Sequence, residues 1–278
     1  MQPQKNNCGI IYHLNHKIAL NRLKKGKIME INKIYCGDCY ELIKNIPNNS
    51  IQCIYTDVPY LYQNGGGGTS DVAKRIRANA DRLAAAKIDK GFDYAIFNEF
   101  VRIQPKINLF IWCSKMQIFD IANWWLNYSK QNNRQIFYEI LTWVKTNPTP
   151  STNNTWLPDT EYCLYFREAG IKLNDGYEHK HKYYLSGLNV EDKNNYGHPT
   201  CKPLEFVEHN LAHVCQPGDT VFDPFLGSGT TAIAAKHLKL NYIGFEINPE
   251  YFKIAEDRLA GWNQKGEMNL FDFSANES

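Results

Sequence analysis

Two acidic residues, each at the end of a short apolar run, are the positions where this sequence could do chemistry. Asp57 closes one run and begins the tetrapeptide Asp-Val-Pro-Tyr, and Asp223 closes another and precedes a glycine-rich stretch. A strand end places a side chain at the edge of a sheet, where open α/β sheets bind their ligands. The sequence therefore predicts two functional loops, first one with a carboxylate and then one rich in glycine.

The glycine-rich loop has the features of a ligand-binding turn. Gly227 and Gly229 have no Cβ, so the backbone can turn tightly and approach a bound molecule. Thr230 begins a predicted helix whose free N–H groups favour a negative or polar ligand group. No Gly-Lys-Ser/Thr follows, so the loop is not a P-loop. The next predicted strand ends in Glu246, about 20 residues on, where an acid can bind both ribose hydroxyls of a nucleoside. The alternative for this acid is a solvated strand end.

Several motifs in a fixed order resemble the β-type amino-methylating DNA methyltransferases, the adenine-N6 and cytosine-N4 family, in which the catalytic motif precedes the cofactor motif. They are Gly37-Asp38-Cys39, Asp57-Val58-Pro59-Tyr60, His198-Pro199-Thr200-Cys201-Lys202-Pro203, the loop from Asp223 to Thr231, and Glu246. The segment from Trp143 to Pro148 also resembles that family, and the match spans roughly residues 31–259. Val58 and Cys201 depart from the family pattern, which has proline and glutamine there.

The resemblance implies S-adenosylmethionine as the cofactor. Asp38 would accept from the adenine amino group, Thr200 and Lys202 would bind the carboxylate of the methionine end, and Glu246 would bind the ribose. The full set of expected cofactor contacts is Asp38, Thr200, Lys202, Asp223, Phe225, Gly227, Ser228, Gly229, Thr230 and Glu246. Asp38 could equally be a helix N-cap, and the segment before Lys202 a plain loop with a helix cap.

The resemblance makes Asp57, Val58, Pro59 and Tyr60 the catalytic loop. An exocyclic amine of a base is a poor nucleophile because its lone pair is delocalised into the ring. The Asp57 carboxylate and the Val58 carbonyl would accept from its two N–H groups and favour a tetrahedral nitrogen. Tyr60 would stack on a base swung out of the duplex. Valine keeps the backbone carbonyl but does not fix φ as proline does. A catalytically impaired DNA-binding relative is therefore one alternative.

The expected activity is site-specific methylation of the N6 amino group of adenine in double-stranded DNA. Aspartate at the first position of the tetrapeptide favours adenine in this family, whereas cytosine-N4 enzymes more often carry serine, and cytosine N4 stays the alternative. Motif order and the Trp143 segment disfavour an RNA or protein-amide methyltransferase. Two basic stretches, residues 74–87 and 172–184, are candidates for phosphate contact. For the first, a solvated helix face is the alternative.

Further partners are weaker expectations. The family resemblance allows a restriction endonuclease partner and a homodimer. Met268-Asn269-Leu270-Phe271 loosely resembles peptides that dock on sliding clamps, and chance apolar residues in a tail are the favoured alternative.

Strands alternate with helices along the chain, which predicts an α/β fold with a doubly wound, mostly parallel Rossmann-like sheet. The resemblance adds a circularly permuted motif order. We expect a basic extension at residues 1–28, with Met29 as the natural start. A methyltransferase domain would follow at 29–260, with a DNA-recognition insert at about 168–198, and then a flexible tail at 261–278. The predicted strands are 31–36, 51–56, 108–113, 136–144, 161–166, 220–223 and 241–246. The predicted helices are 39–46, 72–88, 115–128, 202–214, 230–238 and 249–260, the last capped by Asn248.

Composition narrows the class of protein. The chain has 31 Lys+Arg against 29 Asp+Glu, a net charge of +2, which allows a local basic groove but not a basic coat. No apolar run approaches the roughly 20 residues of a membrane span, and no signal peptide is visible. We expect a cytoplasmic protein with reduced cysteines. Cys36 and Cys39 lack a second pair at metal spacing, and His179 and His181 stand alone, so no metal site is expected.

Overall fold

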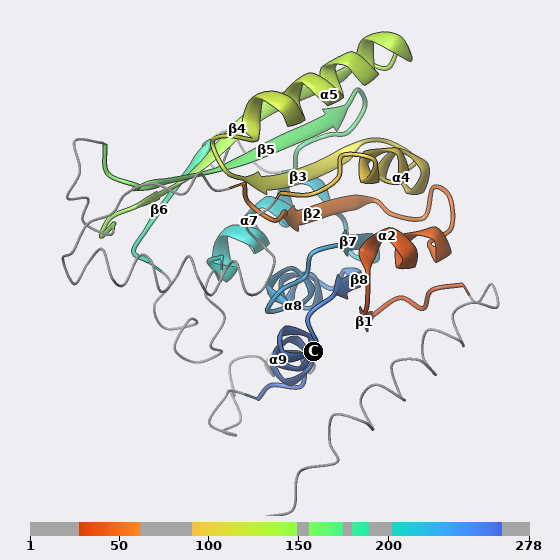
Figure 1. Ribbon diagram of the computed structural model, residues 1–278, viewed down its shortest axis with the longest axis vertical. Helices are drawn as coiled ribbons and strands as arrows, with labels where there is room; N and C mark the ends of the chain where they lie inside the picture. Colours follow the sequence, from red (N-terminus) through yellow and green to blue (C-terminus); the bar gives the residue numbers. More distant parts are fainter. Residues whose placement is uncertain (1–27, 62–90, 149–155, 175–179, 189–201, 263–278) are drawn as a thin grey trace, which may run out of the picture.

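One mixed sheet organises the protein. The computed structural model describes residues 28–61, 91–148, 156–174, 180–188 and 202–262. Within these ranges eight strands pair in the order β1-β8-β7-β2-β3-β5-β4-β6 (Figure 1). The strands are β1 Lys33–Cys36, β2 Cys53–Asp57, β3 Asn108–Cys113, β4 Ile136–Lys145, β5 Thr160–Glu168, β6 Tyr183–Ser186, β7 Thr220–Asp223 and β8 Asn241–Glu246. Among them β5 alone runs antiparallel to its neighbours, so the predicted mostly parallel sheet is confirmed.

Helices cover both faces of the sheet, as a doubly wound fold requires. They are α2 Cys39–Leu42, the 3-10 turn η1 Ile43–Asn45, α4 Ile96–Ile103, α5 Ile118–Gln131, α7 Leu204–Val214, α8 Thr230–His237 and α9 Pro249–Leu259. One core contains α2, α4 and α5 packed on the face that carries Ile54 and Ile111. The other contains α7 and α8 on the face that carries Tyr55 and Trp112. Neighbouring residues of β2 and β3 therefore enter opposite cores, since side chains alternate across a strand.

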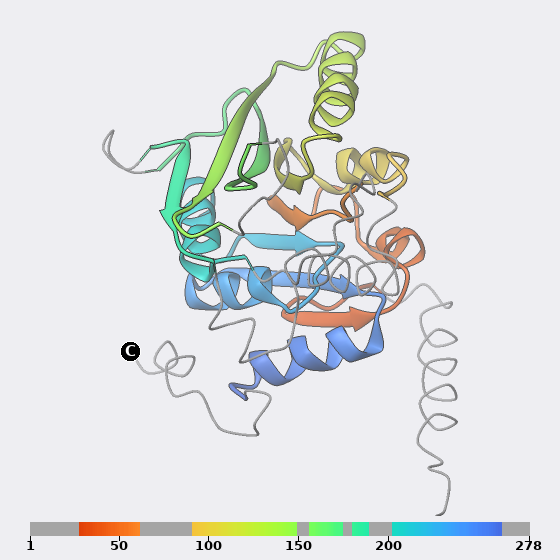
Figure 2. The same cartoon turned by 60° about the vertical axis from the view of Figure 1, so that its left-hand side comes forward.

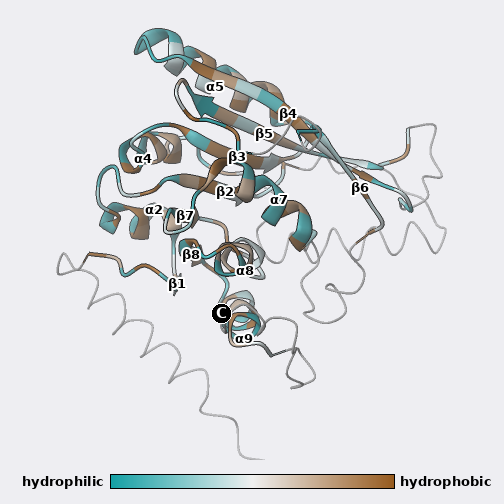
Figure 3. Ribbon diagram, turned by 180° about the vertical axis from the view of Figure 1, so that it is seen from behind, coloured by the Kyte–Doolittle hydropathy of each residue, from teal (hydrophilic) through white to brown (hydrophobic). Residues whose placement is uncertain are grey.

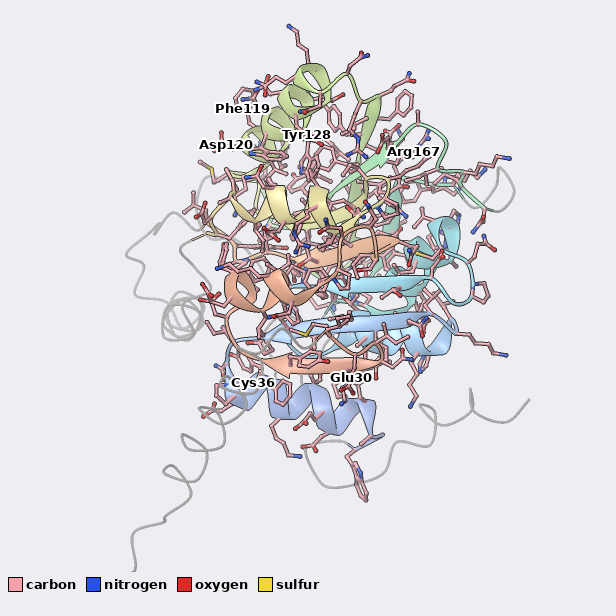
Figure 4. The ribbon with its side chains drawn as sticks, turned by 90° about the vertical axis from the view of Figure 1, so that its right-hand side faces the viewer. Glu30, Cys36, Phe119, Asp120, Tyr128 and Arg167 are labelled. Atoms are coloured by element: carbon pink, nitrogen blue, oxygen red, sulfur yellow. The ribbon has the colours of Figure 1, made fainter. Side chains whose placement is uncertain are left out.

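A different helix packs at each end of the sheet. α5 lies along β4 and β5 at one end of the sheet, and α9 lies at the other end beside β1 and β8 (Figure 1 and Figure 2). Cys36 on β1 and Phe119 on α5 mark these two ends in Figure 4. The central strands β2 and β3 are coloured as hydrophobic over most of their length in Figure 3, which agrees with their burial. None of the described helices has the length and apolar character needed to cross a bilayer.

Element positions largely follow the sequence, with two exceptions. The strands predicted at 108–113, 220–223 and 241–246 are found with those bounds, and the Asn248 side chain caps α9 as expected. Helix α4 was not predicted, although Ile96, Phe97, Phe100 and Ile103 form its buried face. Strand β6 lies inside the segment 168–198, and none of its four residues is buried, so no alternation of apolar and polar residues marks it in the sequence. The predicted helix 72–88 lies outside the described residues.

The sheet order creates a ligand-binding crevice at one point. β2 is followed by β3 on one side, whereas its other neighbour β7 is followed by β8 on the opposite side. The direction in which successive strands are added therefore reverses between β2 and β7. In open α/β sheets, ligands bind outside the carboxyl ends of the strands at such a switch point. Asp57 ends β2 and Asp223 ends β7, so the two loops singled out in the sequence meet there.

Candidate active site

A cavity of about 760 Å³ opens at this switch point, within the size range of small-molecule sites. Its wall includes the turn after β1, the ends of β2 and β7, the glycine-rich loop and the end of β8. Eight of the expected cofactor residues line it: Asp38, Lys202, Asp223, Phe225, Gly227, Ser228, Thr230 and Glu246. All four residues of the Asp57 tetrapeptide line it as well. Residues that were predicted from distant parts of the sequence therefore lie around one cavity.

The glycine-rich loop adopts the backbone that its glycines allow. Gly227 has φ of 56° and Gly229 has φ of 86°, both in the left-handed region. A Cβ on Gly229 would lie 3.0 Å from the Ala255 Cβ, so α9 also requires glycine here. The loop therefore packs closely against α9, and it ends at Gly229, the N-cap of α8. Gly229 lines no part of the cavity wall, and its predicted cofactor contact stays a prediction.

Asp223 holds the start of the glycine-rich loop through three hydrogen bonds. Its carboxylate accepts from the hydroxyls of Thr56 (2.9 Å) and Thr231 (2.7 Å) and from the backbone N–H of Phe225 (3.1 Å). The residue is only 3% exposed. Burial raises the pKa of Asp223 to about 7, against the opposing effect of its three hydrogen-bond donors. Asp223 therefore ties β2, the loop and α8 together.

Arg258 supports the loop from α9. One guanidinium nitrogen, Nη1, donates to the carbonyl of Ser228 (2.8 Å), to the Ser228 hydroxyl (3.0 Å) and to the Thr230 hydroxyl (3.1 Å). Arg258 is 3% exposed, an unusual position for arginine. No pattern in the sequence indicates this role, because the charge lies in the last turn of a helix where a cation is common anyway.

Glu246 closes the opposite side of the loop. Its two carboxylate oxygens accept from the backbone N–H groups of Gly227 (2.8 Å) and Asn248 (2.7 Å). Burial raises its pKa, and those backbone donors act against the rise. A carboxylate has further lone pairs beyond these two bonds. Glu246 therefore has accepting capacity left for the ribose contact predicted for it, and that contact stays a prediction.

Asp38 is the N-cap of α2, as the alternative interpretation expected. Its side chain accepts from the backbone N–H of Tyr40 (2.8 Å). The Tyr40 hydroxyl in turn accepts from the backbone N–H of Asp93 (2.8 Å), which joins this wall to the turn before α4. One oxygen of Asp38 is thereby used in capping, and the adenine contact predicted for it stays a prediction.

The catalytic loop is held by residues of β3 and of the turn after it. The Val58 N–H donates to the Trp112 carbonyl (3.2 Å), and the Val58 side chain is 2% exposed. Proline, which lacks an N–H, could not make this bond. Gln117 donates to the Pro59 carbonyl (3.0 Å) and accepts from the Leu61 N–H (3.3 Å). Valine and glutamine therefore restrain a loop that the usual proline would restrain through φ.

Four charged side chains meet beside Asp57. Lys202 Nζ lies 2.6 Å from Asp57 Oδ2 and 3.0 Å from Glu161 Oε2, and Lys145 Nζ lies 2.6 Å from Glu161 Oε1. Lys202 also donates to the Tyr60 hydroxyl at 3.1 Å. Two acids and two bases balance, which makes the burial of the Lys202 side chain, 6% exposed, tolerable.

These neighbours set the protonation states. Burial disfavours an ionised Glu161, but Lys202 and Lys145 outweigh it and lower the pKa of Glu161 to about 2. Burial raises the pKa of the Asp57 carboxyl, and Lys202 opposes that rise. The Asp57 side chain is 27% exposed where it borders the cavity, while its Oδ1 is buried. Among the described residues Oδ1 has no hydrogen-bond partner, so accepting capacity is left over.

Some predicted positions are not tested. Thr200, the stretch 74–87 and the tail segment 268–273 lie outside the described residues, as do His179 and residues 1–27. Of the second basic stretch, Lys182 pairs with Glu139 and Tyr184 donates to Glu205 (2.6 Å). No group of three or more potential metal ligands occurs in the part of the chain that the structure describes.

Comparison with known proteins agrees with this geometry. A family model described as DNA methylase matches residues 51–257. The Type II methyltransferase M.HinfI of Haemophilus influenzae is 29% identical over 256 residues, covering 82% of this chain and 68% of the relative. The Type II methyltransferase M2.MboI of Moraxella bovis is 30% identical over 243 residues, covering 81% of this chain and 86% of the relative.

Solved structures give the same result. The crystal structure of an M1.HpyAVI–SAM complex matches with a TM-score of 0.59 and 28% identity, covering 82% of this chain and 98% of that one. The PvuII DNA methyltransferase, described as cytosine-N4-specific, matches with a TM-score of 0.58 at 17% identity, covering 90% and 93%. At that identity it shares the fold.

Proposed function

We propose that this protein methylates the N6 amino group of adenine at a specific site in double-stranded DNA. The proposal starts from the family, since the chain belongs to the DNA methylase family of N6 and N4 amino-methyltransferases. The chain is a DNA methyltransferase, and S-adenosylmethionine is its methyl donor. The observation that carries the adenine proposal is the Asp57 carboxylate, which Lys202 holds at Oδ2 and which lines the cofactor cavity with a side chain 27% exposed.

The cavity residues fit the cofactor. Gly227 offers a turn without a Cβ beside the α8 N-terminus, and Glu246 offers an acid at the end of the next strand. These are the groups that bind a nucleoside in Rossmann-like sites. The aromatic ring of Tyr60 lies in the same wall, where a cationic sulfonium is favoured over a neutral group. When bound, the cofactor supplies an electrophilic methyl group.

The chain's own residues then orient the amine. The carboxylate of Asp57 and the carbonyl of Val58 accept from the two N–H groups of an exocyclic amine, which directs the nitrogen lone pair outward. Gln117 and Trp112 fix the loop, so the acceptors are placed before the base arrives. Alignment of this kind supplies much of an enzyme's advantage when the electrophile is already reactive. Tyr60 offers a face on which the extruded base stacks.

Adenine is preferred over cytosine because of the first residue of the tetrapeptide. Asp57 provides a charged acceptor, the residue type that the resemblance associates with N6 of adenine, whereas serine is more usual for N4 of cytosine. Val58 does not favour the impaired alternative, because its N–H and its buried side chain secure the loop. The relatives are named Type II methyltransferases, and a restriction endonuclease for the same DNA site belongs to the proposal.

The experiment incubates the protein with tritium-labelled S-adenosylmethionine and DNA of mixed sequence. Wild type is expected to transfer label to DNA, and Asp57→Ala to lose more than about tenfold in rate, because a hydrogen bond to a charged group is removed. Asp257→Ala, on the exposed surface of α9, serves as the matched control and should act like wild type. Full transfer by Asp57→Ala would refute the site.

A further inference from the structure

We infer that Lys202, anchored by Glu161, is a positioning residue for the catalytic carboxylate: it fixes Asp57 and Tyr60 for the incoming amine. The inference rests on the proposed function, because it concerns the same catalytic loop. It changes the role first expected for Lys202, which was to neutralise the cofactor's carboxylate. Within the described residues, its ammonium contacts Asp57, Tyr60 and Glu161, which all lie on the catalytic side of the cavity.

The geometry around the ammonium is that of a built site. Lys202 lies next to Pro203, the N-cap of α7, so it is placed close to the start of that helix. Its Nζ lies 5.2 Å from the centre of the Tyr60 ring and 5.1 Å from that of Trp112. Two aromatic faces therefore flank the cation, which favours it in this buried position.

Further contacts hold the aromatic floor in place. The Trp112 indole N–H donates to the Tyr55 hydroxyl (3.0 Å), and that hydroxyl also accepts from Asn210 of α7 (3.2 Å). All three residues are buried. The ammonium of Lys202 therefore lies over an indole ring that is held by the core, and Asn210 of α7 takes part in holding it.

Glu161 also restrains the lysine. It comes from β5, accepts from Lys202 at Oε2 and pairs with Lys145 at Oε1. With both oxygens engaged, Glu161 has a fixed orientation and can hold the ammonium at one place. The consequence for Asp57 is that one of its oxygens is committed, so the carboxylate cannot rotate freely. A rotating acceptor would have to be ordered at each turnover, which slows an alignment-limited reaction.

Stability alone does not account for this network. A buried group of ion pairs is seldom more stable than apolar residues of similar volume, because desolvation offsets the attraction. The charges are instead concentrated around one catalytic residue. The titratable groups that face Asp57 or its partners are Lys202, Glu161, Lys145, Tyr60, Tyr55, Asp223, Cys113 and Cys163. Of these, the two lysines alone bring positive charge, and Lys202 is the one that contacts Asp57.

The test compares Lys202→Met with the double variant Lys202→Met/Glu161→Gln. The single change leaves two acids against one base, Lys145, and so endangers folding. The double change removes one charge of each sign and keeps the balance. Lys253→Met, the same substitution on the exposed surface of α9, is the matched control. Three quantities are measured: the cofactor dissociation constant by calorimetry, kcat at saturating cofactor across pH, and the Asp57 carboxyl titration by carbon-13 NMR in the ligand-free protein.

If Lys202 positions Asp57, kcat falls by more than about tenfold in both variants while the cofactor dissociation constant stays within about twofold. In Lys202→Met the Asp57 titration and the acidic limb of kcat move upward by about one pH unit or more, because the opposing charge is lost. A raised dissociation constant with unchanged kcat would assign Lys202 to the cofactor and overturn the inference. So would a titration that stays at its wild-type position in Lys202→Met. The NMR titration needs no methyl transfer, so an inactive wild type would count against the proposed function alone.

Discussion

Replacing Asp57 by asparagine tests how the catalytic carboxylate works with almost no change in shape. Lys202 Nζ lies 2.6 Å from Oδ2 and can only donate. The amide introduced at position 57 must therefore turn its oxygen toward Lys202, and its NH2 group then occupies the place of Oδ1. Because Oδ1 is buried, the oxygen left toward the cavity is now a neutral amide oxygen, a weaker acceptor for the substrate amine than a carboxylate oxygen. Asp57→Asn should therefore be impaired although its shape is kept.

The size of the loss follows from the bond weakened. A hydrogen bond to a charged group contributes about 1.5–3 kcal/mol and one between neutral groups about 1 kcal/mol, so about 0.5–2 kcal/mol is lost. If that bond is made only in the aligned complex, kcat falls by about 2- to 30-fold. Cofactor affinity should change little, because Lys202 still has Glu161 and the cofactor loop is not touched.

The assay is steady-state methylation of DNA at saturating S-adenosylmethionine, with the cofactor dissociation constant measured separately by calorimetry. A thermal melt checks that the variant is folded. Asp257→Asn is the matched control, since it makes the same substitution on the exposed surface of α9 and Asp257 is not among the residues that line the cavity. If Asp57→Asn keeps the full wild-type kcat, the charge of the Asp57 carboxylate is not needed to accept from the amine and the reasoning fails.

Three further predictions concern the framework of the site. Val58→Pro removes the N–H that donates to the Trp112 carbonyl, so it should lower the free energy of unfolding by about 1–3 kcal/mol. The melting temperature in calorimetry should then fall by roughly 2–10 °C, and an unchanged melting temperature would contradict this. Arg258→Met frees the Ser228 end of the loop and should raise the cofactor dissociation constant more than about tenfold; equal affinity would show that the loop stands without it. Asp223 has a raised pKa when folded, so its contribution to stability is largest at low pH and is lost as pH rises from its ordinary value of 3.8 through about 7. Asp223→Asn should therefore gain about 2–3 kcal/mol relative to wild type between about pH 5 and about pH 8 in urea unfolding, and a pH-independent difference would refute the shift.

Sequence reasoning located the two loops because strand ends are local features. Asp57 and Asp223 each follow a compact apolar run, and glycines at 227 and 229 mark a turn without reference to the rest of the chain. That these loops adjoin follows once the sheet is mostly parallel, since carboxyl ends then share one edge. Asp38 as an N-cap and Asn248 as a cap of α9 are equally local, and both are confirmed.

The residues that escaped prediction act across the sheet. Glu161 reaches Lys202 because β5 runs antiparallel beside β3, and its spacing in sequence from Asp57 gives no hint of that contact. Gln117 donates to the Pro59 carbonyl, and its side-chain oxygen accepts from the backbone N–H and the hydroxyl of Ser114. These bonds form a turn before α5, which begins at Ile118. Strand order and side-chain direction decide such contacts, and neither is encoded in the period of the apolar residues.

Nucleoside analysis tests methyl transfer to adenine N6 most directly. DNA that carries neither N6-methyladenine nor N4-methylcytosine is incubated with the protein and S-adenosylmethionine, digested to nucleosides and resolved by liquid chromatography with mass spectrometry. We expect N6-methyladenine in the wild-type reaction and its loss in Asp57→Ala. N4-methylcytosine as the product, or no methylated nucleoside from a folded protein that binds the cofactor, would contradict it.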